Sequence, residues 1–200
     1  MRSGLPVALP GMRIGLLGGS FDPAHEGHVN ITEAALQRFR LDRVWWLVTP
    51  GNPLKAHGPA PLRERIARAQ KLLVDPHVVV TDIEARLQTR MTADTISALK
   101  HLYPGVHFVW LMGSDNLVQF HHWDRWREIA DMVPIGVLAR PGTRLAARNA
   151  VAAQVLRRWR LPVEKAGLLA DSPTPAWVQV NLPMSKLSST ALRRAKGERR

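Results

Sequence analysis

Short apolar runs alternate along the chain with longer segments in which apolar residues recur at helical spacing. The apolar runs predict five buried strands, at residues 13–17, 44–49, 78–83, 107–112 and 135–139. The other segments predict five helices, at residues 29–40, 61–74, 92–103, 123–132 and 145–159. Strands that alternate with helices form a parallel sheet through right-handed crossovers. The pattern therefore predicts an α/β fold whose ligands bind at the carboxyl ends of its strands.

The two ends of the chain depart from this pattern. Residues 1–12 contain two prolines and no extended apolar core, which predicts a flexible arm and argues against a signal peptide. Residues 13–200 have a length that suits a single α/β domain. Within that domain, residues 177–180 predict a short last strand. Residues 188–190 (Ser-Ser-Thr) predict the N-cap of a final short helix that ends near Lys196.

Composition narrows the class of protein. Of the 200 residues, 46% are hydrophobic, which is enough for a packed core and argues against disorder. The absence of cysteine excludes a disulfide framework and a thiolate metal site, and it is compatible with a reducing cytoplasm. No apolar run reaches the length of a membrane span. We therefore expect a cytoplasmic protein with no membrane partner.

The chain is strongly basic. Lysine and arginine number 28 against 16 aspartates and glutamates, a formal net charge of +12, which indicates polyanionic partners such as nucleic acid or nucleotide phosphates. The charges are scattered along the chain, and only residues 193–200 form a dense basic segment. We interpret most of the excess as a solvated surface, with a few arginines that bind substrate.

The most informative stretch is GGSFDPAHEGH, at residues 18–28, between a predicted strand and a predicted helix. Glycines there let the backbone approach a phosphate, and a helix N-terminus favours anions. His25 and His28 are three residues apart, so their imidazoles can point the same way and donate to phosphoryl oxygens. The competing interpretation is an ordinary Gly-Gly turn with structural histidines. The complete string in this context favours phosphate chemistry.

This stretch resembles the GGxFDPxHxGH signature of the nucleotidyltransferase superfamily. The resemblance implies a Rossmann-like nucleotidyltransferase fold, with a parallel sheet and helices on both faces. It also implies that the turn binds the phosphates of ATP, through Gly18, Gly19, Ser20, Phe21, His25 and His28. The signatures of P-loop and dinucleotide-binding proteins are both absent from the sequence.

Further stretches, each after a predicted strand, resemble the nicotinate-nucleotide adenylyltransferase family. The family's NPxK matches residues 52–55 and implies that Lys55 reaches a phosphate. Its Y-T-x-x-T pattern matches residues 91–95 with methionine in place of tyrosine, and implies that backbone amides near Thr92 hold the nicotinate carboxylate. A plain N-cap is the alternative role of Thr92. Met91 removes an aromatic wall that the family usually has.

Three more matches follow in the family's order. Gly113 and Asp115 match its G-x-D, which implies a carboxylate beside the adenosine ribose. Trp123 stands where the family stacks a tryptophan on the nicotinate ring, although most of the seven tryptophans, Trp126 included, are expected to be packing residues. Arg140 matches its RPG and implies a bidentate phosphate ligand, against the alternative of a surface arginine.

The last match is the superfamily's ISSTxIR element, at residues 187–193. Hydroxyls and free N–H groups at a helix start, with an arginine one turn later, imply a second cradle for the triphosphate. The residues that would form it are Ser188, Ser189, Thr190 and Arg193.

Together these resemblances imply that the chain joins ATP and nicotinate mononucleotide to give deamido-NAD and pyrophosphate. The implied catalytic residues are His25, His28, Lys55 and Arg193. The implied mononucleotide-binding residues are Ser20, Phe21, Lys55, Thr92, Trp123 and Arg140. Mg²⁺ would be carried by the phosphates, so no protein metal site is expected. A homo-oligomer is left open.

Two alternatives carry different partners. Pantetheine-phosphate adenylyltransferases share the superfamily's motifs, but they are typically shorter and lack the region of Trp123. Residues 183–188 resemble the KMSKS loop of aminoacyl-tRNA synthetases, and the basic charge would suit tRNA. However, 200 residues leave no room for a synthetase's other domains, so no nucleic-acid partner is expected. The preference for nicotinate over nicotinamide stays open.

Overall fold

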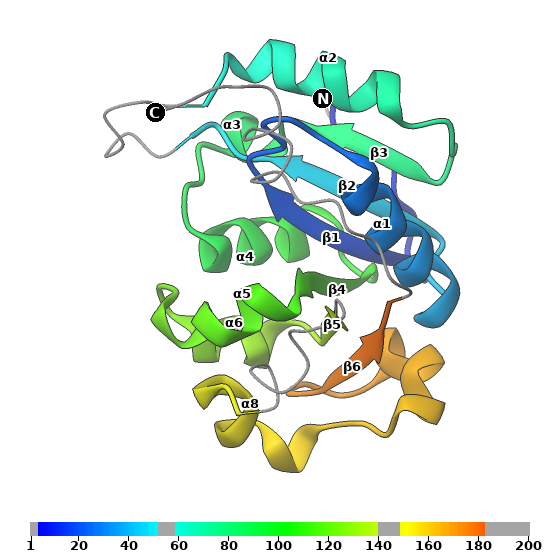
Figure 1. Cartoon of the computed structure of the whole chain (residues 1–200), viewed down its shortest axis with the longest axis vertical. Coiled ribbons are helices and arrows are strands. Elements are labelled where there is room, and N and C mark those ends of the chain that lie inside the picture. Colours follow the sequence, from blue (N-terminus) through cyan, green and yellow to red (C-terminus); the bar gives the residue numbers. More distant parts are fainter. Residues whose placement is uncertain (1–3, 52–58, 140–148, 183–200) are drawn as a thin grey trace.

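Six parallel strands form one twisted sheet at the centre of the molecule (Figure 1). The structure is a computed structural model, and it describes residues 4–51, 59–139 and 149–182. The strands are β1 (Arg13–Gly19), β2 (Arg43–Val48), β3 (Val78–Thr81), β4 (His107–Gly113), β5 (Ile135–Ala139) and β6 (Trp177–Asn181). All six correspond to strands expected from the sequence.

The order of the strands places the loop after β1 at a switch in direction. The order is β3-β2-β1-β4-β5-β6, so the chain builds one half of the sheet outward from β1 and then returns to build the other half from β4. In the register of β1 and β4, Leu17 lies opposite Leu111. In open α/β sheets a crevice forms at such a switch point, beyond the carboxyl ends of the strands. The turn at residues 18–28 begins at this point.

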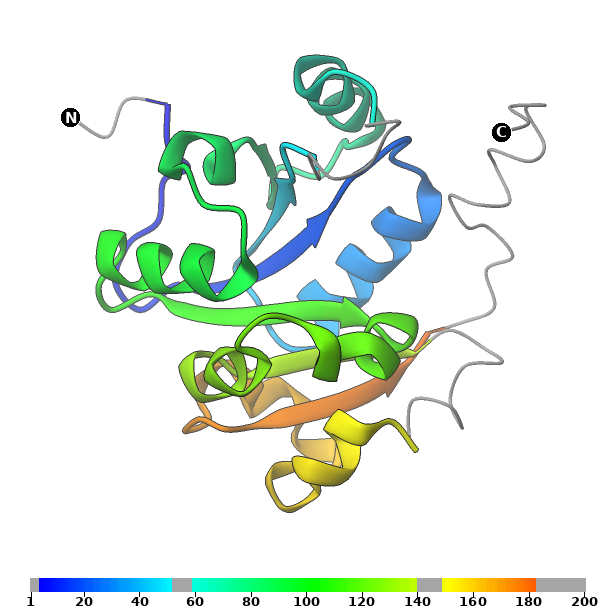
Figure 2. The ribbon, with the colours of Figure 1, turned by 90° about the vertical axis from the view of Figure 1, so that its left-hand side faces the viewer.

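Helices cover both faces of the sheet (Figure 2). The α-helices are α1 (Glu26–Arg38), α2 (Leu62–Leu72), α3 (Ile83–Leu87), α4 (Thr92–Leu102), α5 (Ser114–Gln119), α6 (Trp126–Met132) and α8 (Val151–Val155). The 3₁₀ helices are η1 (Phe120–His122), η2 (Arg157–Trp159) and η3 (Val163–Asp171). The arrangement confirms the Rossmann-like α/β fold.

Two apolar cores lie on opposite faces because side chains alternate along a strand. On β2, the fully buried Trp45 points into the core formed with α3, α4, α5, α6 and α8. Its neighbour Trp46 points into the other core, with α1, α2 and η3. Near-continuous apolar strands are typical of a parallel sheet that is buried on both sides.

The ends of several elements differ from the sequence-based expectation. The strand expected at 78–83 ends at Thr81, because the buried Ile83 begins α3. The helix expected at 123–132 begins only at Trp126, because Arg125 has a left-handed φ of 48°. The described part of the helix expected at 145–159 divides into α8 and η2. The short helices α3, α5, η1 and η3 were not expected from the sequence.

Residues 4–12 lie against the body of the protein, and Figure 2 shows this segment, in deep blue, running beside α4. The Tyr103 hydroxyl donates to the carbonyl of Pro6 at 2.7 Å. The Gly11 N–H donates to the carbonyl of Gly105, also at 2.7 Å. The flexibility of the N-terminal arm stays a prediction.

Candidate functional site

Buried aromatic side chains pack against the turn after β1. A Cβ on Gly18 would lie 2.8 Å from Cη2 of Trp110, so the site accepts only glycine without a shift of the indole. Phe21 has a left-handed φ of 48°, is 1% exposed, and stacks on Trp46 at 4.7 Å between ring centroids. Its ring therefore belongs to the core. Ser20, beside it, is exposed.

His25 and His28 lie together at the N-terminus of α1, with ring centroids 4.0 Å apart. His25 is the N-cap and is buried, and its Nδ1 accepts from the Gly27 N–H at 3.0 Å. Nδ1 of His28 accepts from the His25 N–H at 3.3 Å. The ring of His28 also contacts Phe21 and Trp46. The sequence-based expectation that the two imidazoles share one side of the helix start is confirmed.

These hydrogen bonds fix the tautomer of both rings. In a neutral imidazole one nitrogen donates and the other accepts. Because each Nδ1 accepts from a backbone N–H, each ring carries its proton on Nε2. In both rings the N–H donor is therefore Nε2, and both rings lie at the N-terminus, the positive end, of the 13-residue helix α1. Such an arrangement can stabilise negative charge that develops on a phosphoryl group.

The end of β4 adds a carboxylate next to this turn. Gly113 is the N-cap of α5, and Asp115 lies exposed in the first helical turn. The Asp115 carboxylate folds back so closely that a Cβ on Gly113 would collide with its Oδ1. Ser114 between them is fully buried. The loops after β1 and β4 thus bring the histidines, Gly113 and Asp115 to neighbouring strand ends, as parallel topology requires.

Thr92 is the first residue of α4 and not its cap. The N-cap is Met91, which has an extended backbone, makes no side-chain cap hydrogen bond and is 50% exposed. The alternative role of Thr92 as an N-cap is therefore wrong, because the helix begins one residue earlier than that role requires. Thr95 closes the turn instead: its Oγ1 lies 3.2 Å from the Met91 carbonyl oxygen and 2.8 Å from Oγ1 of Thr89.

Trp123 is half-buried in the loop between η1 and α6. It meets Trp110 and Phe120 edge-to-face, with ring centroids at 6.1 and 5.4 Å. Trp110 in turn packs against Gly18, so an aromatic path joins Trp123 to the turn after β1. Trp126 is 7% exposed and belongs to the core, as expected from the sequence.

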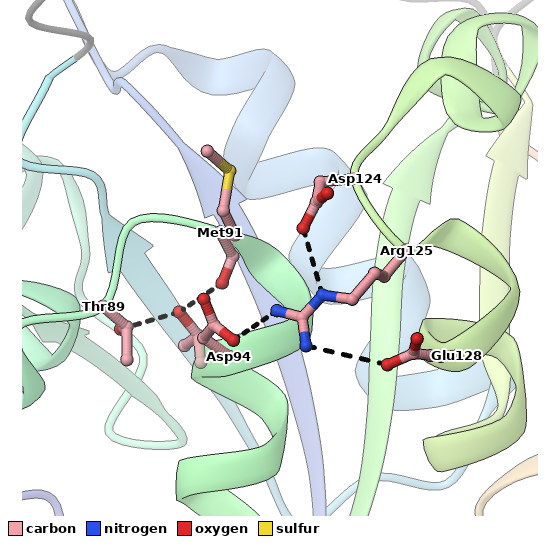
Figure 3. A network of polar contacts seen from close by, with 7 residues as sticks. Thr89, Met91, Asp94, Asp124, Arg125 and Glu128 are labelled. Atoms are coloured by element: carbon pink, nitrogen blue, oxygen red, sulfur yellow. Dashed lines mark hydrogen bonds and ion pairs between the residues drawn. The ribbon is translucent and has the colours of Figure 1, made fainter.

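A cluster of charges joins the loop of Trp123 to the start of α4 (Figure 3). The Arg125 guanidinium binds Asp94 through Nη2 and Asp124 through Nε, the latter at 3.1 Å. Its Nη1 lies 3.6 Å from Oε2 of Glu128. The hydrogen bond to Asp94, followed by the weaker effect of the one to Asp124, raises the pKa of Arg125 above its usual value. No local pattern in the sequence points to this cluster, because Asp94 and Arg125 are 31 residues apart in the chain.

Glu84 is a buried carboxyl group behind the same turn. It is 5% exposed, and its Oε1 lies 3.4 Å from Oγ1 of Thr95. Burial raises the pKa of Glu84 to about 7, although the hydrogen bond with Thr95 opposes the shift. The Thr89 N–H donates to the Glu84 carbonyl at 3.0 Å. Glu84 thus supports the chain that leads into α4.

Other expectations from the sequence fall on parts of the chain that lie outside the described residues. These are the roles of Lys55, Arg140, Ser188, Ser189, Thr190 and Arg193. Over residues 4–51, 59–139 and 149–182, no three or more histidine, aspartate or glutamate side chains gather as a metal site. None of the helices described in these ranges has the length and apolar character needed to cross a membrane.

Comparison with known proteins places the chain in a family. A family model for cytidylyltransferase-like proteins matches residues 16–195. The probable nicotinate-nucleotide adenylyltransferase of Roseobacter denitrificans is 60% identical over 193 residues, which cover 96% of this chain and 97% of that protein. Its counterpart from Ruegeria pomeroyi is 58% identical over 197 residues, covering 98% and 92%.

Solved structures share the fold. Nicotinic acid mononucleotide adenylyltransferase of Plasmodium falciparum, complexed with NaAD, superposes with a TM-score of 0.70 at 16% identity, covering 92% of this chain and 83% of that one. A structure from Vibrio parahaemolyticus, a putative nicotinate-nucleotide adenylyltransferase, gives 0.56 at 17% identity, covering 94% and 90%. With relatives near 60% identity along almost its whole length, the chain belongs to the nicotinate-nucleotide adenylyltransferase family, within the cytidylyltransferase-like proteins.

Proposed function

We propose that this chain transfers the adenylyl group of ATP to nicotinate mononucleotide, with the Nε2–H groups of His25 and His28 as its central phosphate donors. The products are deamido-NAD and pyrophosphate. The observation that carries the assignment of donors is that each Nδ1 accepts from a backbone N–H, which puts the proton of each ring on Nε2 at the N-terminus of α1. Family membership supplies the reaction.

The chemistry requires positioning and charge stabilisation. A phosphate oxygen of nicotinate mononucleotide attacks the α-phosphorus of ATP in line, forming one P–O bond while the bond from that phosphorus to the bridging oxygen of pyrophosphate breaks. The electron pair of the broken bond leaves with pyrophosphate. The attacking phosphate is already ionised, so no general base is needed. His25 and His28 stabilise the oxygens on which charge develops.

The other assigned residues would bind the two substrates around this centre. Backbone groups of Gly18, Gly19, Ser20 and Phe21 contact phosphates, and Gly113 and Asp115 contact the adenosine ribose. Lys55, Ser188, Ser189, Thr190 and Arg193 complete the triphosphate site. Backbone amides near Thr92, the indole of Trp123 and the guanidinium of Arg140 hold the mononucleotide. The closeness of the first two groups at neighbouring strand ends supports this assignment.

Mg²⁺ has no cage of side chains in the described part of the chain. We propose that it arrives on the triphosphate oxygens, which are ligands it prefers. No step of the reaction is assigned to it. A cytoplasmic location, a homo-oligomer and the absence of a nucleic-acid partner likewise remain proposals, which fractionation, sedimentation and tRNA-binding assays test.

The deciding experiment offers Mg·ATP with nicotinate mononucleotide, nicotinamide mononucleotide or phosphopantetheine and measures pyrophosphate release and the dinucleotide product. We expect fastest release with the nicotinate substrate and deamido-NAD as product. Release with phosphopantetheine alone would contradict the acceptor. Release with none of the three would overturn the function.

A further inference from the structure

Arg65 is a fully buried arginine in the first half of α2, at 1% exposure. All its bonds go to backbone carbonyl oxygens. Its Nε donates to Ala60 at 2.7 Å, its Nη1 to Ser20 at 2.6 Å, and its Nη2 to Thr49 at 2.9 Å and Pro50 at 3.4 Å. One guanidinium thus binds the turn after β1, the residues that follow β2 and the segment that leads into α2.

Burying the charge of Arg65 costs free energy that an apolar side chain at the same position would not cost. A buried charge loses hydration, and an apolar side chain of similar volume often stabilises a protein as well or better. Burial accordingly lowers the pKa of Arg65, and attraction to Asp22 opposes the shift. Asp22 lies in the same phosphate-binding turn, and its Oδ2 accepts from the Ala60 N–H at 3.2 Å. Arg65 and Asp22 therefore bind the carbonyl and the N–H of the same residue, Ala60.

The bond to Ser20 controls the direction of a neighbouring backbone donor. In a trans peptide the C=O of one residue and the N–H of the next point in opposite directions. Because the Ser20 carbonyl points at Arg65, the N–H of Phe21 points away from α2. Phe21 also holds a left-handed φ of 48°, a conformation that persists only where surrounding contacts over-determine it. Arg65 supplies one such contact and the stack on Trp46 supplies another.

We propose that Arg65 is a positioning residue for adenylyl transfer: by holding the Ser20 carbonyl and the residues that follow β2 in one guanidinium, it sets the orientation of the backbone donors that lead into His25 and His28. It touches no substrate and acts through the turn. The proposal rests on the proposed function of that turn. The fork geometry of arginine is required, because a lysine ammonium cannot reach three segments in one plane.

The test compares Arg65→Met and Arg65→Lys with Arg68→Met as a control. Arg68 lies on the same helix, and its exposed side chain pairs with Glu64. We expect folded Arg65 variants whose kcat falls on the order of 10²-fold, while KM for both substrates changes little, because misplacement of donors acts mainly on the transition state. Arg68→Met is expected to keep wild-type kcat. If Arg65→Met does not fold, Arg65→Lys provides the same test, and the same loss of kcat is expected.

A second measurement separates this proposal from the proposed function. Amide hydrogen exchange at Ala60, whose N–H donates to Asp22, and the NMR resonances of the His25 and His28 rings report the state of the turn without any turnover. Faster exchange and shifted rings in the Arg65 variants, together with the loss of kcat, support the proposal. A folded Arg65 variant with wild-type kcat, or one with an unchanged turn, overturns it. An inactive wild-type protein whose turn still depends on Arg65 overturns the proposed function instead.

Discussion

The turn at residues 18–28 and the region around Thr92 and Trp123 are built in different ways. The first is anchored by buried groups: Phe21 stacks in the core, and both histidines are capped by backbone N–H groups. The second is tied together by exposed charges, with the Arg125 side chain 41% exposed and its partners between 48% and 59%. Buried contacts fix geometry more tightly than exposed ion pairs, whose worth is small.

This difference matches the two tasks proposed for the regions. Transition-state stabilisation depends on donors held at fixed positions, so small displacements are costly. Binding of a flat ring between an indole and a helix start tolerates more movement. Substitutions in the first region should therefore act on kcat and those in the second on KM, and the following predictions test that division.

The largest effect is expected from His28→Ala. Loss of one Nε2–H donor should lower kcat by roughly 10²–10³-fold with the fold intact. His101→Ala, on the exposed last turn of α4, is the matched control and should keep its activity. Steady-state kinetics and circular dichroism measure both variants. Normal turnover of His28→Ala would remove the histidine from the mechanism.

Glu84 predicts a pH-dependent stability in the second region. Its pKa is about 7 in the folded protein and 4.5 in an ordinary glutamate, so the folded state favours the protonated carboxyl. The free energy of unfolding should fall as pH rises from about 4.5 through about 7, by on the order of 3 kcal/mol. Glu84→Gln should not show this fall with pH, and above pH 7 its free energy of unfolding should exceed that of the wild type. Urea unfolding at several pH values measures it; an equal pH response of both proteins would disprove it.

Trp123→Ala should raise KM for nicotinate mononucleotide roughly threefold to thirtyfold, the range expected for loss of an aromatic face over a cationic ring. KM for ATP serves as the internal control and should change less. Equal increases in both constants would show that Trp123 only packs against Trp110 and Phe120.

The smallest effect is expected from Arg125→Met. Exposed ion pairs contribute little and are screened by salt, so KM for the mononucleotide should rise by less than about fivefold. The increase should shrink at high salt, because salt weakens the same pairs in the wild type. Asp94→Asn should produce a similar change that does not add to that of Arg125→Met. A tenfold loss of kcat would contradict the division between the regions.

The sequence predicted the first region well and the second less well. Strand periodicity and a local motif placed His25 and His28 correctly at the start of a helix, because the residues that signal this turn are consecutive in the sequence. The role of Arg65 depends on carbonyls from three segments, which no local pattern contains. The helical spacing of Arg65 and Ala69 nevertheless indicates that this arginine lies on the buried side of α2. The pairing of Asp94 with Arg125 depends on tertiary packing between α4 and α6, which no local pattern contains.

The most direct test of the account is the tautomer of the two histidines, measured by ¹⁵N NMR before and after addition of a non-hydrolysable ATP analogue. The caps on Nδ1 predict that both rings carry their proton on Nε2 in the free protein. They also predict that the Nε2–H resonances of His25 and His28 shift when the triphosphate binds. Protons on Nδ1, or rings that do not respond to the analogue, would contradict the claim that this pair binds the phosphates of ATP.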